Sequence, residues 1–164
     1  MSAILILLLA AGPYTVKGKT VLRLTDVQQA VRQLAPARGD ARNLRITWRA
    51  TRATPAMRLR AHRQTPGPVP QQRALELADD RLLVLAVDAA GQIRFWSVIA
   101  NPRLIRAEFP DASGRLSGRV IERADAELLV DIPADPAIRE VRVYTPQAED
   151  LRLSGTVAVP RERR

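Results

Sequence analysis

From residue 43 onward, apolar and polar residues alternate in short runs, and this alternation constrains the fold more than any other feature. In NLRITWRA, residues 43–50, Leu, Ile and Trp alternate with Arg, Thr and Arg, and MRLRAHR, residues 57–63, repeats the pattern. A period of two is that of a strand with one face in a dry interior and the other in water. The two runs predict a pair of strands joined through residues 50–56.

Further apolar runs follow at intervals of about 8–12 residues, with Gly, Pro, Asp and Ser between them, which is typical of all-β domains. The candidate strands are 20–24, 74–77, 82–87, 92–99, 103–109, 116–122, 126–132, 138–145 and 151–159. This pattern predicts a mainly β, antiparallel sandwich with one short N-terminal helix. The latter two-thirds resembles an immunoglobulin- or fibronectin-type sandwich. The Cys–Trp–Cys pattern of true immunoglobulins is absent, so the resemblance implies a fold and no functional residue.

One segment has the period of a helix. TDVQQAVRQLAPARGD, residues 25–40, places Val27, Ala30, Val31 and Leu34 on one apolar stripe. Thr25 and Gln28 have the spacing of a capping box at the N-terminus of the helix, and the Pro and Gly that follow predict its end.

The chain begins with an apolar run whose length is typical of an export signal. Ala3–Ala11 is followed by small residues, which predicts cleavage after Ala11 or near Gly18, although no basic residue precedes the run. We therefore expect residues 1–18 to be a signal peptide or apolar N-terminal segment, 19–160 a β-sandwich domain and 161–164 a basic tail. The predicted location is periplasmic or secreted. The alternative is a buried first strand in a cytoplasmic protein.

The same segment contains a partial phosphate-loop pattern. Gly12 and Gly18 precede Lys19 and Thr20, but five residues separate the glycines where the loop needs four, and Pro13 removes one amide donor. Residues 82–92 resemble the Asp-x-x-Gly-Gln switch segment of small GTPases at Asp88, Gly91 and Gln92, yet no Asn-Lys-x-Asp motif follows. The alternative function is therefore a cytoplasmic P-loop-like nucleotide hydrolase that uses Lys19, Thr20 and Asp88.

The residues that usually carry catalysis are sparse. The chain has no Cys, and its one His, His62, falls in an Arg-rich run without an adjacent carboxylate. Glu127 and Asp131 are about 13 Å apart along an extended strand, too far for a glycosidase pair. The serines lack a G-x-S-x-G elbow. We predict a non-enzymatic protein with no catalytic residues, no metal site and no cofactor.

The charge is unevenly distributed along the chain. Residues 1–75 contain 13 basic and 2 acidic residues, net +11, whereas residues 76–164 contain 13 and 15, net −2, which together give the net charge of +9. The predicted strand pair brings Arg45, Arg49, Arg58 and Arg60 to one face. Like charges across a sheet repel, so this face needs anions.

Two sources of those anions are consistent with the sequence. Acidic residues of the second half, such as Glu127, Asp131 and Glu140, would neutralise the arginines internally. Alternatively, the face binds an acidic protein or a polyanionic envelope polymer. Nucleic acid is disfavoured because few aromatic residues accompany the arginines, and bases bind by stacking. The sequence thus predicts an exported binding or accessory module with an anion-binding face at Arg45, Arg49, Arg58 and Arg60.

Overall fold

The protein is mainly β, as predicted, with 56% of its residues in strands and 6% in helix. The computed structural model describes residues 14–50, 55–110 and 112–161. The apolar run Ala3–Ala11, the expected cleavage position after Ala11 and all but the first residue of the basic tail lie outside the described residues. Within the described part, no helix is both long enough and apolar enough to cross a membrane.

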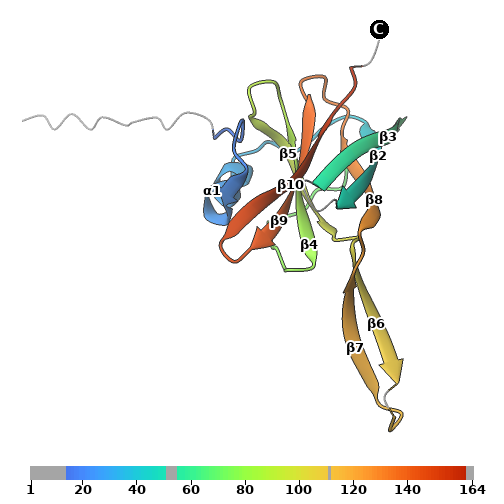
Figure 1. Ribbon diagram of the computed structural model, residues 1–164. Coiled ribbons are helices and arrows are strands. Elements are labelled where there is room, and N and C mark those ends of the chain that lie inside the picture. The colour runs from blue at the N-terminus through green and yellow to red at the C-terminus, as the bar shows by residue number, and fades with distance from the viewer. Residues whose placement is uncertain (1–13, 51–54, 111, 162–164) are drawn as a thin grey trace, which may run out of the picture.

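The chain forms two sheets and a separate hairpin (Figure 1). Every pair of neighbouring strands in the described residues is antiparallel. The five-stranded sheet has the order β1-β10-β9-β4-β5 and the three-stranded sheet the order β3-β2-β8, while β6 and β7 pair only with each other. The elements are β1 Val21–Arg23, α1 Leu24–Arg32, β2 Ala41–Ala50, β3 Pro55–Thr65, β4 Arg81–Val87, β5 Ile93–Ala100, β6 Leu104–Pro110, β7 Leu116–Glu122, β8 Asp125–Pro133, β9 Glu140–Gln147 and β10 Asp150–Ala158.

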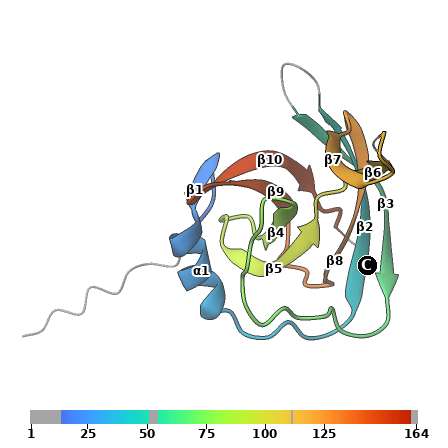
Figure 2. The same ribbon diagram turned by 90° about the horizontal axis from the view of Figure 1, so that it is seen from below.

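The five-stranded sheet is covered on both faces, which explains why β4 is apolar throughout. Leu82, Val84 and Ala86 enter a core shared with the three-stranded sheet. The alternate residues Leu83, Leu85 and Val87 enter a second core. This second core lies against α1 and the N-terminal segment, on the other side of the sheet (Figure 2). A strand buried on both faces has no wet positions, so its sequence shows no alternation.

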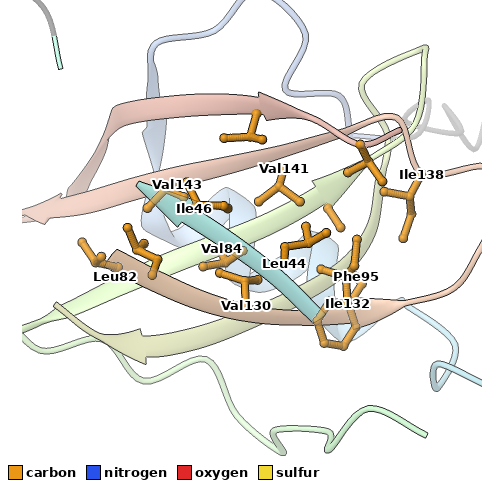
Figure 3. Packing of buried hydrophobic residues seen from close by; sticks show 14 of the residues in the cluster. Leu44, Ile46, Leu82, Val84, Phe95, Val130, Ile132, Ile138, Val141 and Val143 are labelled. Atoms are coloured by element: carbon orange, nitrogen blue, oxygen red, sulfur yellow. The ribbon is translucent and has the colours of Figure 1, made fainter. Parts of the chain in front are cut away.

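The first core joins the two sheets. Figure 3 shows Leu44 and Ile46 of β2 and Val130 and Ile132 of β8 among residues of the five-stranded sheet. Leu44, Ile46 and Ile132 are fully buried. The inward positions of the alternating runs therefore form the core that the period of two predicted.

The finer part of the predicted fold, an immunoglobulin-like sandwich, is not confirmed. In immunoglobulin domains the second strand of the A-B-E-D sheet lies between the first and the fifth. The same order in the smaller sheet would place β3 between β2 and β8. Instead β2 is central, and its hairpin partner β3 is at the edge. This order results from the pairing of β8 with β2 along Ala41–Arg49.

The helix carries the predicted apolar stripe but not the predicted cap. Val27 and Val31 are buried in the second core, as the spacing indicated. The helix begins two residues earlier than the predicted cap at Thr25 implies, Arg23 occupies the N-cap position, and no side chain caps the helix. Gln28 instead donates from Nε2 to the carbonyl oxygen of Leu75, at 3.2 Å. The strand predicted at residues 74–77 is wrong, because this segment crosses the helical side of the sheet without pairing and buries Leu75.

The predicted pairing of β2 with β3 is confirmed, with one β-bulge that the sequence did not indicate. Arg45 lies opposite Ala61 and Ile46 opposite Leu59, so Arg60 is an extra residue in β3. An extra residue shifts the alternation of the strand by one position. Ala61, predicted to face the interior, is therefore opposite the outward residue Arg45 and is exposed.

The N-terminal residues from Tyr14 onward pack on the body. Val16 is fully buried, and its amide donates to the carbonyl oxygen of Gly91 at 2.9 Å. Gly91 has a φ of +81°, and a Cβ at that position would lie 2.6 Å from the Cβ of Lys17. Glycine is required here by both the turn and the close approach. The boundary expected after residue 18 therefore falls inside a segment that packs against the second core.

Candidate anion-binding face

The outer face of the three-stranded sheet contains the predicted arginine site. On β2, Arg45, Thr47 and Arg49 alternate with the buried residues Leu44, Ile46 and Trp48 and therefore point away from the core. Arg58 of β3 lies opposite Thr47 and is exposed, as is Arg60 at the bulge. The structure thus places all four predicted arginines on β2 and β3, with the two β3 residues along the edge of the sheet.

Strand β8 supplies carboxylates to one side of this face. Glu127 Oε2 lies 3.7 Å from Arg45 Nε, and Asp125 Oδ1 lies 3.9 Å from Arg49 Nε. About half of each side chain in the Arg45–Glu127 pair is exposed, and about two-thirds or more in the other pair. Asp131 accepts a hydrogen bond from Asn43 Nδ2 at 2.9 Å. Water screens these contacts, so each reduces the positive potential of β2 without removing it.

The arginines of strand β3 differ from those of β2 in this respect. Among the described residues, no carboxylate lies within 4 Å of the guanidinium groups of Arg58, Arg60 or Arg63. All three side chains are exposed, and β3 borders only β2 within its sheet. The face is therefore asymmetric in charge, with β8 acidic, β2 basic and partly neutralised, and β3 basic and open to solvent.

Three other polar residues have surroundings that differ from those of the four arginines. Arg42 is only 6% exposed, and its Nη1 donates to the carbonyl oxygen of Pro160 at 3.1 Å. Glu140, a candidate partner for the face, forms its ion pair with Arg142. His62 lies opposite the buried residue Leu44, because the bulge moves it out of the alternation that Arg58 follows. Arg52 lies outside the described residues.

Asp125, the partner of Arg49, was not among the acidic residues that the sequence predicted for this face. The ion pair depends on the register between β2 and β8, which are 76 residues apart at this pair. A weak signal did exist, because Asp125, Glu127 and Asp131 recur at odd positions around the apolar residues of one predicted strand. Outward carboxylates on one strand are the natural complement of outward arginines on another.

Aromatic stacking is not available on this face. Trp48 is 2% exposed and points into the first core, and the guanidinium of Arg103 lies over its ring at 4.8 Å from the centroid. The arginines thus offer charge and paired N–H donors, which suit carboxylate, phosphate or sulfate groups.

The residues of the nucleotide-binding alternative serve other roles. Thr20 is followed by strand β1, where a phosphate loop would continue into a helix. Asp88 accepts hydrogen bonds from the amides of Ala90 and Gln92, at 2.9 and 3.0 Å, and so closes its own turn. The ammonium of Lys19 lies 4.6 Å from the centroid of the Tyr14 ring. This geometry gives the phosphate-loop interpretation no support.

Beside this segment lies a cluster with perturbed ionisation. Burial raises the pKa of Tyr14, and the nearby Asp26 raises it further. Burial likewise raises the pKa of Tyr144, while the guanidinium of Arg142 acts in the opposite direction. Arg142 also donates to the carbonyl oxygen of Val16 at 2.5 Å. Both phenols therefore stay neutral near pH 7, and the cluster fastens the N-terminal segment to the sheet.

One cavity lies apart from the arginine face. It has a volume of about 500 Å³ and lies between the C-terminal end of α1, residues 71–76 and β5. Arg32, Arg73 and Arg94 line it, and Glu76 is its only carboxylate. Arg94 is already paired with Asp135 at 3.4 Å. No group of three or more His, Asp or Glu residues that could hold a metal ion occurs among the described residues.

Comparisons of the chain with protein-family models, with curated proteins and with solved structures find no match.

Proposed function

We propose that this protein is a non-enzymatic binding or accessory module that contacts an anionic partner through Arg58 and Arg60, with Arg45 and Arg49 beside them. The observation that carries this proposal is the asymmetry of the face. Carboxylates of β8 contact the two arginines of β2, whereas no described carboxylate lies within 4 Å of the two on β3. The positive charges of Arg58 and Arg60 are therefore still available to bind an anion.

The shape of the site favours an extended partner. The arginines lie along exposed strands of a sheet rather than in a cavity, and β3 runs from Pro55 to Thr65 at the edge of the body. A polyanionic envelope polymer, with carboxylate, phosphate or sulfate groups along its length, fits this row better than a small ligand does. An acidic segment of another protein offers the same chemistry at fewer points.

We further infer an exported protein built as a β-sandwich. The shared core between the two sheets supports the sandwich description, and the apolar run at residues 3–11 supports export. Burial of Val16 makes cleavage after Ala11 preferable to cleavage near Gly18, which would take Val16 out of the second core. Mass measurement of the chain recovered from the periplasm or medium tests this inference. Loss of 11 residues agrees with it, and an intact N-terminus in the cytoplasm contradicts it.

Retention on a heparin column tests the binding proposal. The wild-type chain should be retained, and its elution should depend steeply on salt, because each bound anion releases counterions. The quadruple variant Arg45→Ser/Arg49→Ser/Arg58→Ser/Arg60→Ser should lose this retention. A matched control changes four exposed arginines outside the three-stranded sheet, Arg23, Arg32, Arg38 and Arg152, to Ser. Equal losses in the two variants would show that heparin senses only net charge, and the proposal would then be wrong.

A further inference from the structure

The β6–β7 hairpin extends away from the body (Figure 1), and within the described part of the chain its strands pair with no third strand. Most of the large exposed apolar side chains among the described residues are on this hairpin: Ile105, Phe109, Leu116, Val120 and Ile121, which are 40–68% exposed. A two-stranded hairpin is at best marginally stable in water. Because the hairpin is long and exposes these apolar side chains, we expect a binding partner to cover it.

The base of the hairpin is held firmly. Arg106 Nη2 lies 2.9 Å from Asp80 Oδ2, and Arg103 Nη2 lies 2.7 Å from Glu122 Oε1. Arg103 Nε also donates to the carbonyl oxygen of Arg123 at 2.8 Å, while the same guanidinium stacks on Trp48. These contacts fix the direction of the hairpin, so its strands are presented as an arm rather than as a loose loop.

No strand of the described residues pairs with the outer edge of β6, whereas the edge of β5 is capped. At β5, the side chain of Gln72 donates to the carbonyl oxygen of Val98 at 2.8 Å and accepts from its amide at 2.7 Å, which caps that edge. At the hairpin, the amide of Arg123 donates to the carbonyl oxygen of Arg103. Because hydrogen-bonded pairs alternate along an antiparallel ladder, the backbone groups of Arg106 and Glu108 face away from β7.

The sequence of β6 is complementary to itself. In LIRAEFP, residues 104–110, the residues on either side of Ala107 are Arg106 and Glu108, and beyond them are Ile105 and Phe109. When two copies of β6 run antiparallel about Ala107, Arg106 lies opposite Glu108 of the second copy, and Ile105 lies opposite Phe109. The charged pair then attracts, and the apolar pair packs across the new ladder.

We propose that the protein forms a symmetric dimer through β6, in which two hairpins join into a four-stranded antiparallel sheet with the order β7-β6-β6-β7. Arg106 and Glu108 of each copy exchange backbone hydrogen bonds with Glu108 and Arg106 of the other. Ala107 faces its own equivalent at the two-fold axis, in a non-hydrogen-bonded pair with a Cα separation of about 4.5 Å. Pro110 lies opposite Leu104 of the second copy and has no amide proton, so the new ladder lacks one hydrogen bond at each end.

A second copy of the chain is the expected partner, because β6 is complementary to another β6 strand. Isologous two-fold contacts require a surface that matches itself, and LIRAEFP does so in both charge and apolar character. On one side of the new sheet, Ile121, Ile105 and Phe109 of the second copy form a continuous apolar row. Ile105, Phe109 and Ile121 thus become neighbours on this side of the dimer sheet, while Leu116 and Val120 are on the other side.

The absence of cysteine allows a direct test by crosslinking. Ala107→Cys places two thiols at a separation that a disulfide accepts. We expect mild oxidation to convert most of this variant into a covalent dimer. Val120→Cys is the control, because it lies on β7 at similar or greater exposure, yet the two copies would be three strand spacings apart, roughly 14 Å. Equal crosslinking of the two variants, or none in either, would overturn the proposal.

A mixing experiment fixes the register, and a proline tests the hydrogen bonds. Ile105→Cys and Phe109→Cys should crosslink to each other when mixed, and neither should crosslink efficiently alone.

Glu108→Pro removes an outward amide without removing a bond to β7, so dimer association measured by analytical ultracentrifugation should weaken by roughly tenfold or more. A wild-type chain that sediments as a monomer at about 100 µM, far above the Kd of a specific interface, would refute the dimer. Binding of that monomer to vesicles, with loss in Phe109→Ser, would then identify the hairpin as a membrane contact.

Discussion

Strands β8 and β3 lie on opposite sides of β2. They differ in how deeply their inward residues are buried, which affects stability, and in the charge of their outward residues, which affects binding in the proposed function. The inward residues of β8, Leu128, Val130 and Ile132, are at most 1% exposed. The inward residues of β3, Met57 and Leu59, are only partly buried. Outward, β8 has carboxylates that neutralise β2, whereas β3 has arginines without a close carboxylate in the described part of the chain. The comparison indicates that β8 contributes more to the core than β3 does, and in the proposed function β3 is the strand that contacts the partner.

One contact explains why β3 is nevertheless held in place. Gly155 of β10 has no Cβ, and a Cβ there would lie 2.6 Å from Met57 Cγ. The glycine coincides with a register irregularity in β10, between Leu153 and Gly155. Met57 therefore packs directly on the backbone of the larger sheet, which fixes the arginine strand without burying its outer side.

The largest expected difference between the two strands is in stability. Leu128→Ala should lower the free energy of unfolding by about 3 kcal/mol, since it empties a fully enclosed site. Leu59→Ala should cost about 1 kcal/mol, because its side chain is already partly in water. Urea unfolding followed by tryptophan fluorescence measures both. Equal costs would show that β3 contributes to the core as much as β8 does.

The next difference is in binding. Arg58→Ser/Arg60→Ser should remove more heparin retention than Arg45→Ser/Arg49→Ser, because the second pair is partly neutralised before any ligand arrives. If both β3 arginines contact bound anions, the slope of log K against log salt should fall by about 2 in the first variant. The same loss in both variants would mean that the β8 carboxylates have no influence on binding.

A smaller effect comes from the carboxylates themselves. Glu127→Gln should increase heparin retention, because it releases Arg45 and removes a repelling charge from the face. Glu149→Gln, in the β9–β10 turn away from the face, is the matched control for net charge. An increase of the same size in the control would leave no local role for Glu127.

The smallest expected effect is that of Glu127→Gln on stability. The Arg45–Glu127 pair is about half exposed on both sides, so screening limits its contribution to about 0.5 kcal/mol. Urea unfolding of this variant should therefore almost superimpose on that of the wild type. A cost of about 2 kcal/mol would show that the ion pair contributes substantially to stability. The outward residues of β8 would then stabilise the fold as its inward residues do.

Periodicity predicted the strands well, because alternation reports burial directly. The predicted run 116–122 coincides with β7, and the inward residues of β2 are those of the first core. The spacing at residues 74–77 was misleading, since Leu75 is buried by a segment that crosses the sheet without pairing. The local sequence pattern indicates which residues are buried, but it does not indicate which segments of the chain pack against them.

The details of the arginine face needed the structure for a related reason. The bulge at Arg60 inserts one residue into β3, and no residue type in this run signals it. The pairing of Arg49 with Asp125 depends on a long-range register. The burial of Arg42 depends on the last described residues of the chain, where Pro160 accepts its hydrogen bond. The pairing of the two arginine-containing strands could be predicted from the sequence, but not which of their arginines have a carboxylate beside them.

Backbone amide chemical shifts during titration with a short sulfated oligosaccharide test the central claim most directly. We expect the largest shifts at Arg58, Arg60 and the neighbouring residues of β3, smaller ones at Arg45 and Arg49, and almost none along β8. Shifts centred on the cavity between α1 and β5, or spread evenly over all exposed arginines, would contradict a binding face on β3.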